Sequence, residues 1–473
     1  MPQFLGQLSD EHLNSVRAHF DSRPAETTPA SRSYRRLLAH YYNLLIPADA
    51  SVLEVGCGDG ELLALINAGR KTGIDLSDTQ LARARARIPE GAFFQQSGEL
   101  LNLGETFDII ILSETLDLSA DVQQLLERLA TVATPGTRLL INFHNNLWRP
   151  IFTTGEWCKL RTPVPSANWL SSHDIENFLE LSDWESIKYQ PRILWPLATP
   201  LLAPLINRWI APFLPFACLA IFTVARLRPV SAPKPLSVSV VIPARNEAGN
   251  IEAAVLRTPQ MGAWTELIFI EGHSKDNTWD EIERVRASYP DCRIVTLRQT
   301  GKGKGNAVRE AYAVATGDIL MILDADLTMP PEELPKFYDA IVSGKAEFAN
   351  GSRLVYPMEK KAMQFLNMLA NKFFGLAFSW LLGQRVKDTL CGTKVLTREH
   401  YLKIAANRAY FGEFDPFGDF DQLFGADKLN LKIRDIPIRY RERTYGTTNI
   451  QRWRHGLLLF RMLGVAARKL KFV

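Results

Sequence analysis

The sequence has few cysteines, little net charge, and no low-complexity tract or internal repeat. Its five cysteines, at positions 57, 158, 218, 292 and 391, are too scattered to form a disulfide framework or a metal-ligand cluster, which favours a reducing compartment. A formal net charge of +4 in 473 residues is too small to indicate nucleic-acid binding. The amino-terminal residues lack a basic region followed by an apolar one, so we expect no signal peptide and a cytoplasmic protein.

The sequence also lacks an apolar run that clearly predicts a membrane-spanning helix. The nearly uncharged stretch 209–225 is shorter than the roughly 20 residues that such a helix needs. It also contains Pro212 and Pro215. We interpret it as an interfacial loop that leads into a buried strand, in preference to a transmembrane helix.

What the sequence does have is the length and composition of a folded protein with more than one domain. It is 46% hydrophobic and 22% charged, and 473 residues predict two or three domains. A proline-rich stretch near residue 230 has the composition of a linker. We expect two α/β domains at 1–228 and 237–448, a linker at 229–236, and a basic amphipathic carboxyl-terminal helix at 449–473.

The first domain contains a glycine-rich turn between a short strand and a helix. The strand 51–55 is followed by Gly56, Gly58 and Gly60, and the next strand ends at Asp75. Such a turn lets a ligand approach the backbone at the positive end of a helix. An acidic residue at the end of the second strand is placed to bind a ribose. The spacing G-x-G-x-G differs from the dinucleotide fingerprint G-x-G-x-x-G, so hydride transfer is the weaker interpretation.

These residues resemble the first motif of the class I S-adenosylmethionine-dependent methyltransferases, which have a Rossmann-like fold. The resemblance covers about residues 35–228 and implies S-adenosylmethionine as cofactor. The cofactor-binding residues that it implies are Glu54, Gly56, Gly58, Gly60, Asp75 and, near the adenine, Glu99. Strands at 107–113 and 137–142 fit this fold, as does an antiparallel pair formed by 184–194 and 219–227.

The methyl acceptor is not evident from the sequence. His144, Asn145, Asn146 and Trp148 follow the fifth strand, where a substrate would lie, although capping or packing is the favoured interpretation of each. A domain that binds the cofactor weakly or not at all, and serves as a scaffold, is the alternative.

In the second domain, a strongly apolar segment ends in two carboxylates. Residues 319–323 predict a strand buried on both faces, and Asp324 and Asp326 follow it. Parallel strands bind ligands at their carboxyl ends. Two anions this close repel each other unless a cation lies beside them, and oxygen ligands suit Mg²⁺ or Mn²⁺. We therefore expect a divalent metal carrying a diphosphate here.

Neighbouring segments extend this pattern. Strands at 237–242, 266–270 and 293–297 alternate with helices, which predicts a parallel α/β sheet. The motifs P-x-x-N-E, S-x-D-x-T, G-K-G and D-A-D occur in the order found in family 2 glycosyltransferases of the GT-A fold. The segment from about 237 to 456 is most similar to the dolichyl- and polyprenyl-phosphate sugar transferases of that family.

The resemblance implies roles for individual residues. Nucleotide-sugar binding falls to Pro243, Arg245, Glu247, Ile270, Glu271, Asp324, Ala325, Asp326 and Arg353. The residues that the resemblance assigns to metal binding are mainly Asp326, with Asp324 and Thr328. Those that it assigns to the acceptor phosphate are Asp388, Lys394 and Arg443. Because Glu271-Gly272 replaces the usual pair of aspartates, the choice between a UDP- and a GDP-hexose stays open.

The chemistry expected is a metal-dependent, inverting transfer of a hexose to a polyprenyl phosphate. A lipid phosphate is already an anion at neutral pH and needs orientation more than deprotonation. Asp326 and Arg443 are the expected catalytic residues, together with Asp421 in the acceptor-side position of an acid; Asp419 is a close alternative to Asp421. A glycan or soluble acceptor is a second hypothesis, and a non-enzymatic assembly factor with degenerate sites is a third.

The carboxyl-terminal segment predicts peripheral attachment to the cytoplasmic face of a membrane. Ile450, Trp453, Leu457, Phe460 and Leu463 recur at helical spacing. Arginines at 454, 461 and 468 share a separate flank, and an apolar stripe beside a basic flank is typical of a helix lying in the membrane interface. The apolar helix expected at 362–382 is placed alongside. The alternative is that both helices simply pack on the sheet.

Overall fold

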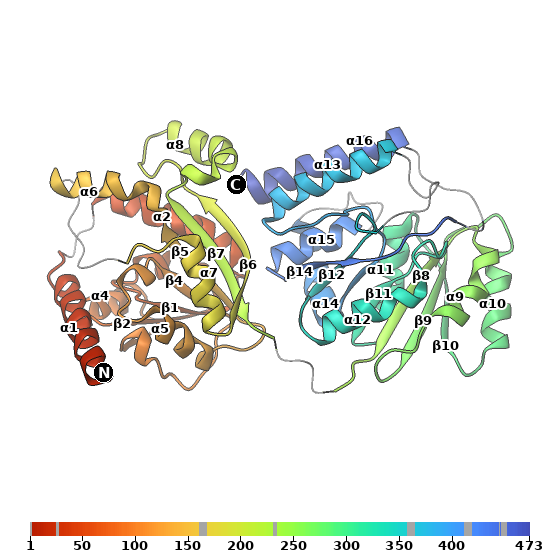
Figure 1. Cartoon of the computed structure of the whole chain (residues 1–473), viewed down its shortest axis with the longest axis horizontal. Helices are drawn as coiled ribbons and strands as arrows, with labels where there is room; N and C mark the ends of the chain where they lie inside the picture. Colours follow the sequence, from red (N-terminus) through yellow and green to blue (C-terminus); the bar gives the residue numbers. More distant parts are fainter. Residues whose placement is uncertain are drawn as a thin grey trace. The chain divides into compact units, whose positions relative to one another are not determined.

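The structure is a computed structural model that describes residues 2–24, 28–159, 168–229, 234–356, 365–410, 419–443, 445 and 452–473. The chain divides into two compact units: unit 1 covers Met1–Arg228 and unit 2 begins at Pro229 (Figure 1). Each unit is built on one seven-stranded sheet with helices packed against it. The α/β fold class predicted for both units is confirmed. Of the expected linker 229–236, residues 230–233 lie outside the described residues.

The sheet of unit 1 has the strand order β3-β2-β1-β4-β5-β7-β6. Only β7 runs antiparallel to its neighbours, so the predicted antiparallel pair is confirmed. The strands are β1 Ser51–Val55, β2 Arg70–Asp75, β3 Ala92–Gln95, β4 Ile109–Ser113, β5 Arg138–His144, β6 Trp184–Arg192 and β7 Ala220–Leu227. Their carboxyl ends, β7 excepted, meet at one edge of the sheet.

Helices cover both faces of this sheet, and local signals fix where several of them begin. Ser77 caps α4 by accepting a hydrogen bond from the backbone N–H of Gln80, and Asp121 caps α5 in the same way through Gln124. The helices are α1 Pro2–Asp21, α2 Pro29–Leu45, α3 Glu61–Leu65, α4 Asp78–Arg87, α5 Val122–Leu129, α6 Arg149–Trp157, α7 Ser172–Leu181 and α8 Leu202–Leu205.

The stretch 209–225 is not one continuous helix. Short turns, among them 3-10 turns at Ala211–Phe213 and Pro215–Ala217, lead into β7, whose residues are mostly buried. This is the loop followed by a buried strand that the sequence predicts. In the described part of the chain, no helix has the length and apolar character required to cross a membrane.

The sheet of unit 2 has the strand order β10-β9-β8-β11-β13-β12-β14. Its strands are β8 Val238–Ala244, β9 Thr265–Glu271, β10 Arg293–Arg298, β11 Ile319–Ile322, β12 Phe348–Ser352, β13 Lys394–Thr397 and β14 Ile433–Pro437. The sheet is mixed, because β13 pairs antiparallel with both β11 and β12. The alternation of strands and helices in the sequence did not predict this reversal.

Strand β11 lies at the centre of unit 2. All four of its residues are fully buried, with side chains in the apolar layers on both faces of the sheet, as the sequence predicts. The helices are α9 Ile251–Arg257, α10 Thr278–Ser288, α11 Lys304–Val314, α12 Leu334–Val342, α13 Phe365–Leu382, α14 Arg398–Ala406, α15 Asp419–Lys428 and α16 Arg452–Ala466. This burial holds the end of β11, and the two carboxylates after it, in a fixed position.

Candidate functional sites

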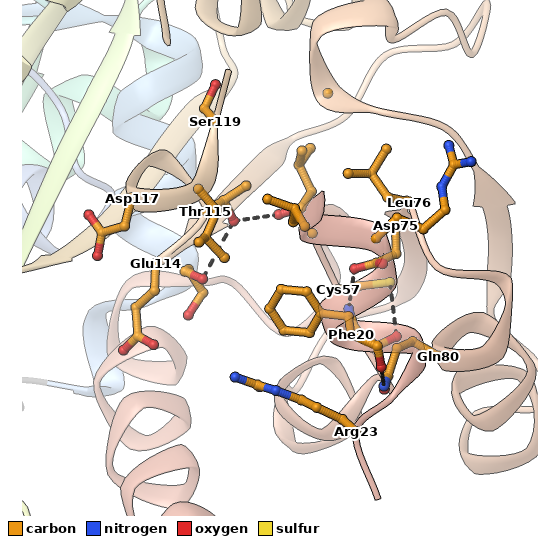
Figure 2. A pocket seen from close by; sticks show the side chains of 18 of the residues that line it. Phe20, Arg23, Cys57, Asp75, Leu76, Gln80, Glu114, Thr115, Asp117 and Ser119 are labelled. Carbon is orange, nitrogen blue, oxygen red and sulfur yellow. Dashed lines mark hydrogen bonds between the residues drawn. The ribbon is translucent and has the colours of Figure 1, made fainter. Parts of the chain in front are cut away.

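Unit 1 contains a cavity of about 470 Å³ at the carboxyl edge of its sheet. The turn after β1, the end of β2, the segment after β3 and the segment after β4 all line it. In Figure 2, Asp75 and Leu76 lie on one side of the cavity and Glu114 and Thr115 on the other, with Phe20 between them in this view. The cavity lies where ligands bind in open α/β sheets.

The three glycines of the turn have different surroundings. All three have left-handed backbone angles, with φ of 74°, 52° and 72° for Gly56, Gly58 and Gly60. A Cβ on Gly58 would meet no atom within 4 Å and would project into open space, whereas one on Gly60 would meet Ala84 of α4 at 3.1 Å. Gly56 and Gly58 line the cavity, and Gly60 instead allows α4 to pack closely.

Asp75 links the second strand to the glycine turn. Its carboxylate accepts hydrogen bonds from the backbone N–H groups of Gly58, at 2.8 Å, and Ser77, at 2.9 Å. Burial raises the pKa of this carboxyl, and the two backbone donors oppose that rise. Asp75 therefore holds the turn open and also lines the cavity, as its assignment to a ribose requires.

Two other residues expected to bind the cofactor have different positions. Glu54 is 1% exposed, is not among the residues that line the cavity, and burial raises the pKa of its carboxyl to about 8. Its position therefore does not support the expected contact with the cofactor. Glu99 does line the cavity, but its carboxylate already accepts hydrogen bonds from Ser119, at 2.9 Å, and from the backbone N–H of Ala120, at 3.0 Å.

Helix α1 also lines the cavity, which no motif in the sequence predicts. Leu13, Val16, Phe20 and other residues of this helix line the cavity. Its carboxyl-terminal end is held to α4, because Gln80 donates a side-chain hydrogen bond to the backbone oxygen of Phe20 at 2.7 Å. Helix α1 thus forms part of the cavity wall.

A charged group lies at the ends of β4 and β5, and of its members only His144 was a candidate from the sequence. The His144 ring lies 3.3 Å from a carboxylate oxygen of Glu114 and 3.2 Å from one of Asp117, and all three residues line the cavity. Burial alone would lower the pKa of His144, but the two carboxylates raise it to about 10. Glu114 adopts a left-handed φ of 60°, a strained conformation of the kind that occurs at functional sites.

In unit 2, polar loops follow β8, β9 and β11 at one edge of the sheet. The register aligns Ala244 with Glu271 and places β11 parallel to β8. Each loop contains one residue other than glycine in the left-handed region: Asn246, His273 and Leu327. Three such conformations at one edge indicate a site whose backbone is held by its surroundings.

Asp324, the first carboxylate after β11, pairs with a lysine of the G-K-G loop. Lys304 Nζ lies 2.6 Å from Asp324 Oδ1. Burial would raise the pKa of Asp324, but Lys304, with smaller contributions from Arg353 and Lys394, lowers it overall. A Cβ on Gly392 would overlap both members of the pair, so a glycine is required at that position.

Asp326, the second carboxylate, pairs with an arginine from the carboxyl-terminal part of the unit. Arg443 donates hydrogen bonds to Asp326, at 2.6 Å, and to Glu247, at 2.8 Å. Thr328 donates its hydroxyl to the other oxygen of Asp326 at 2.8 Å. The structure thus brings together Glu247, Asp326, Thr328 and Arg443, which are distant in sequence. Thr328 is buried and orients Asp326.

Two residues expected at the acceptor phosphate are buried beside this edge. Asp388 is 0% exposed and accepts hydrogen bonds from Arg353 Nε and Nη2 at 2.7 and 2.8 Å. Burial acts to raise the pKa of Asp388, but Arg353 lowers it to about 2. Lys394 is also 0% exposed. These positions correct the expected contacts: Asp388 orients Arg353, and Lys394 contributes positive charge from below the surface.

The remaining nucleotide residues divide between surface and core. Arg245 is exposed and Pro243 half-buried at the end of β8. Ile270 is 0% exposed and Ala325 4% exposed, so their side chains are not accessible to a ligand. Glu271 is buried, and its carboxylate accepts a hydrogen bond from the backbone N–H of Ser274.

Asp421, the expected acceptor-side acid, belongs to α15. It is nearly buried, and Arg408 Nε donates a hydrogen bond to its carboxylate at 2.7 Å. The side chain of its alternative, Asp419, is outside the described residues, as are residues 411–418 that precede it.

The residues after β11 fit a metal ion that is bound partly by protein carboxylates and partly by the phosphates of the substrate. Among the described residues, no group of three or more His, Cys, Asp or Glu side chains is arranged to hold a metal ion. Mg²⁺ is usually bound by one or two carboxylates together with substrate phosphates, and Asp324 and Asp326 supply that number. In this structure Lys304 and Arg443 balance the negative charges of Asp324 and Asp326. Both side chains are also suited to binding the phosphates of a nucleotide.

Comparison with known proteins assigns each unit to a family. Residues 30–189, in unit 1, match the family model described as a methyltransferase domain. Residues 239–403, in unit 2, match the model described as glycosyl transferase family 2.

Curated relatives support the second assignment. The chain is 34% identical over 140 residues to the dolichol-phosphate mannosyltransferase of Pyrococcus furiosus, an alignment covering 29% of this chain and 39% of that protein. It is 29% identical to glycosyltransferase AglJ of Haloferax volcanii, covering 48% of this chain and 71% of the relative. It is 29% identical to the dolichyl-phosphate beta-glucosyltransferase of Saccharomyces cerevisiae, covering 43% and 66%. The chain therefore joins a methyltransferase domain, in unit 1, to a family 2 glycosyltransferase domain, in unit 2.

Proposed function

We propose that unit 2 transfers a hexose from a nucleotide sugar to a polyprenyl phosphate with a divalent metal, and that unit 1 transfers a methyl group from S-adenosylmethionine. The observation that carries the first part is the position of Asp324 and Asp326 after the buried strand β11, each beside a cation from a distant part of the chain. Carboxylates for a metal and cations for phosphates, at one edge of the sheet, suit a nucleoside diphosphate leaving group.

Asp326 would be the main ligand of the metal and Asp324 would serve mainly the nucleotide; the metal would supply positive charge for the departing diphosphate. Arg443, which pairs with Asp326 in this structure, would orient the acceptor phosphate. Arg353, held by Asp388, adds a second fixed guanidinium. A single in-line displacement inverts the configuration of the sugar.

The acceptor class rests on the relatives, two of which are named for transfer to dolichyl phosphate. The test is transfer of radiolabelled hexose from a UDP- or GDP-sugar into the organic phase with extracted polyprenyl phosphate. Label in the organic phase supports the proposal. Label that instead enters a soluble or glycan acceptor overturns the assigned acceptor, and no transfer to any acceptor supports a non-enzymatic role.

For unit 1, the cavity and the surroundings of Gly58 and Asp75 support S-adenosylmethionine binding. Gly58 and Asp75 would hold the cofactor, which would supply an electrophilic methyl group to a nucleophilic atom of the acceptor. Calorimetry on the full chain tests the binding, and no heat at millimolar ligand would favour the scaffold alternative.

We also propose that unit 2 attaches to the membrane surface through α13 and α16. Phe460 of α16 packs against Phe373 and Phe374 of α13, with ring centroids 5.8 and 5.2 Å apart. Leu376 and Leu457 are each 75% exposed, and Arg461 and Arg468 are exposed as well. The opposite face of α16 packs on the core through Leu459, Met462 and Ala466. Of the predicted stripe, Ile450 and the Trp453 side chain lie outside the described residues, and Leu463 is half-buried.

Flotation with anionic vesicles tests this attachment. Leu457→Glu together with Leu376→Glu changes two exposed side chains and should reduce the bound fraction without unfolding the protein. Binding equal to that of the unchanged protein would mean that the two helices only pack on the sheet.

A further inference from the structure

The β6–β7 connection of unit 1 carries an exposed apolar surface. Ala220 at the start of β7 pairs with Arg192 at the end of β6 and with His144 at the end of β5. Residues 193–219 therefore emerge at the same edge of the sheet as the cavity. Large apolar side chains of this connection are exposed, including Leu197, Leu201, Leu205, Phe213, Leu214 and Phe216.

Helix α6 continues this surface to the cavity. Phe152 and Thr153 on one side of α6 line the cavity, while Ile151 and Trp157 are 56% and 84% exposed. Hydrogen bonds fix the two segments together: Trp148 Nε1 donates to the backbone oxygen of Ala217 at 2.9 Å, and the Asn145 amide donates to that of Phe216 at 2.7 Å. Both segments lie on the same side of unit 1 in Figure 1.

The conformation of Leu201 indicates that this exposure is built into the fold. Leu201 immediately precedes α8, is 88% exposed and adopts a left-handed φ of 64°. A bulky residue rarely adopts this conformation, and such an outlier is a reason to look for a function. Soluble proteins seldom expose contiguous apolar patches of this kind without a binding partner.

Charge and composition identify the partner as a lipid surface. Residues 193–219 contain no aspartate or glutamate, and their only charged residue is Arg208, whose guanidinium lies 5.6 Å from the Trp209 ring. In α6, Arg149 is exposed as well. The one acidic residue of α6, Glu156, is half-buried and lines the cavity. Exposed leucine, tryptophan, phenylalanine and arginine with no exposed acidic residue suit the interface of a bilayer with anionic head groups.

We propose that α6 and the β6–β7 connection dock unit 1 on an anionic bilayer, and that the methyl acceptor is a membrane-borne molecule that reaches the cavity from that surface. The acceptor class rests on the methyl transfer proposed above. The proposal concerns residues of unit 1 alone and does not depend on the attachment proposed for α13 and α16. A bilayer-facing cavity mouth gives a poorly water-soluble acceptor a route that does not cross water.

The test is hydrogen–deuterium exchange of the full chain, with and without vesicles of phosphatidylcholine and phosphatidylglycerol. Vesicles should slow exchange in peptides from 146–157 and 196–217. Leu201→Glu combined with Phe216→Glu should remove that protection and lower the vesicle partition coefficient about tenfold, since two apolar side chains no longer leave water. The matched control is Leu181→Glu, because Leu181 is 55% exposed on α7 beside the start of β6, at the opposite edge.

The outcomes separate docking from the proposed chemistry. S-adenosylmethionine binding without vesicles should be the same in the double variant and the unchanged protein, which shows that unit 1 is folded. Unchanged exchange in both segments on vesicle-bound protein overturns the docking. So does a dimer in solution that the double variant converts to a monomer, because the surface would then join two copies. Absent cofactor binding with intact vesicle protection would instead overturn the proposed methyl transfer.

Discussion

Replacing Gly58 by valine tests the assignment of the unit 1 cavity to S-adenosylmethionine. A Cβ at Gly58 would project into space that contains no protein atom within 4 Å, so the added side chain competes only with a ligand. The left-handed φ of 52° adds a strain of about 1–2 kcal/mol for a residue with a Cβ. We expect Gly58→Val to remain folded at reduced stability and to lose cofactor binding. A dissociation constant moved from about 1 µM beyond about 1 mM corresponds to a loss of about 4 kcal/mol.

Gly60→Ala is the matched control, because Gly60 also has a left-handed φ, of 72°. Its Cβ would meet Ala84 at 3.1 Å, away from the cavity, so this variant should lose stability and keep its affinity. Calorimetry measures both affinities, and urea unfolding measures both stabilities. A folded Gly58→Val protein that binds S-adenosylmethionine within tenfold of the original would refute the reasoning, and so would equal loss of binding in both variants.

Three further predictions concern single side chains. Asp75→Ala should weaken cofactor binding by roughly 1–3 kcal/mol, the usual cost of a lost charge-assisted hydrogen bond. Asp78→Ala, at an exposed site of α4, should not change the affinity. Equal affinities of the two variants in calorimetry would contradict this prediction. Glu54 has a folded pKa of about 8 against an ordinary value of 4.5, so its stabilisation is complete below pH 4.5 and is lost as pH rises towards 8. The free energy of unfolding of Glu54→Gln should therefore rise relative to that of the original protein between pH 4.5 and pH 8, by up to about 1.4 kcal/mol per pH unit. Urea unfolding at pH 4.5 and pH 8 measures this difference, which would be the same at both pH values if Glu54 were ionised throughout. Arg443→Ala should raise the apparent acceptor constant more than the donor constant in steady-state kinetics, and the reverse would remove Arg443 from the acceptor phosphate.

Features that depend on local pattern were predictable from the sequence. The apolar run 319–323, the glycine turn after β1 and the polar loops after β8 and β9 are each encoded within a few neighbouring residues. Parallel strands align their carboxyl ends, so these local features also placed Asp324, Asp326, Glu247 and Asp75 at the correct edges of the two sheets.

Features that depend on packing between distant segments were not predictable. Val55 lines the cavity, yet Glu54, one residue earlier, is buried and does not line it. Gly60 has the same spacing as Gly56 and Gly58 but contacts α4. His144, for which packing was the favoured interpretation, lines the cavity because Glu114 and Asp117, about 30 residues earlier, lie beside it. The position of Glu114 after β4 is a signal that would have found this group.

The ion pairs of unit 2 show the same limit. The sequence predicted that two neighbouring carboxylates require a cation, and it favoured a metal. The structure places Lys304 beside one and Arg443 beside the other, across separations of 20 and 117 residues. Which cation balances a carboxylate in the absence of ligand depends on how loops from several strands converge, and no single segment encodes that.

The most direct test of the central claim is transfer of labelled hexose to polyprenyl phosphate by Asp326→Asn, with and without a chelator. Asparagine keeps the size of the side chain and an acceptor for the Thr328 hydroxyl, so the fold should persist while the rate falls by at least about a hundredfold, or about 2.7 kcal/mol. Glu332→Gln, which breaks an exposed ion pair with Arg257, should leave the rate unchanged. The account predicts organic-phase label only with Mg²⁺ or Mn²⁺ and an intact Asp326. Undiminished transfer in chelator, or by Asp326→Asn, would contradict it.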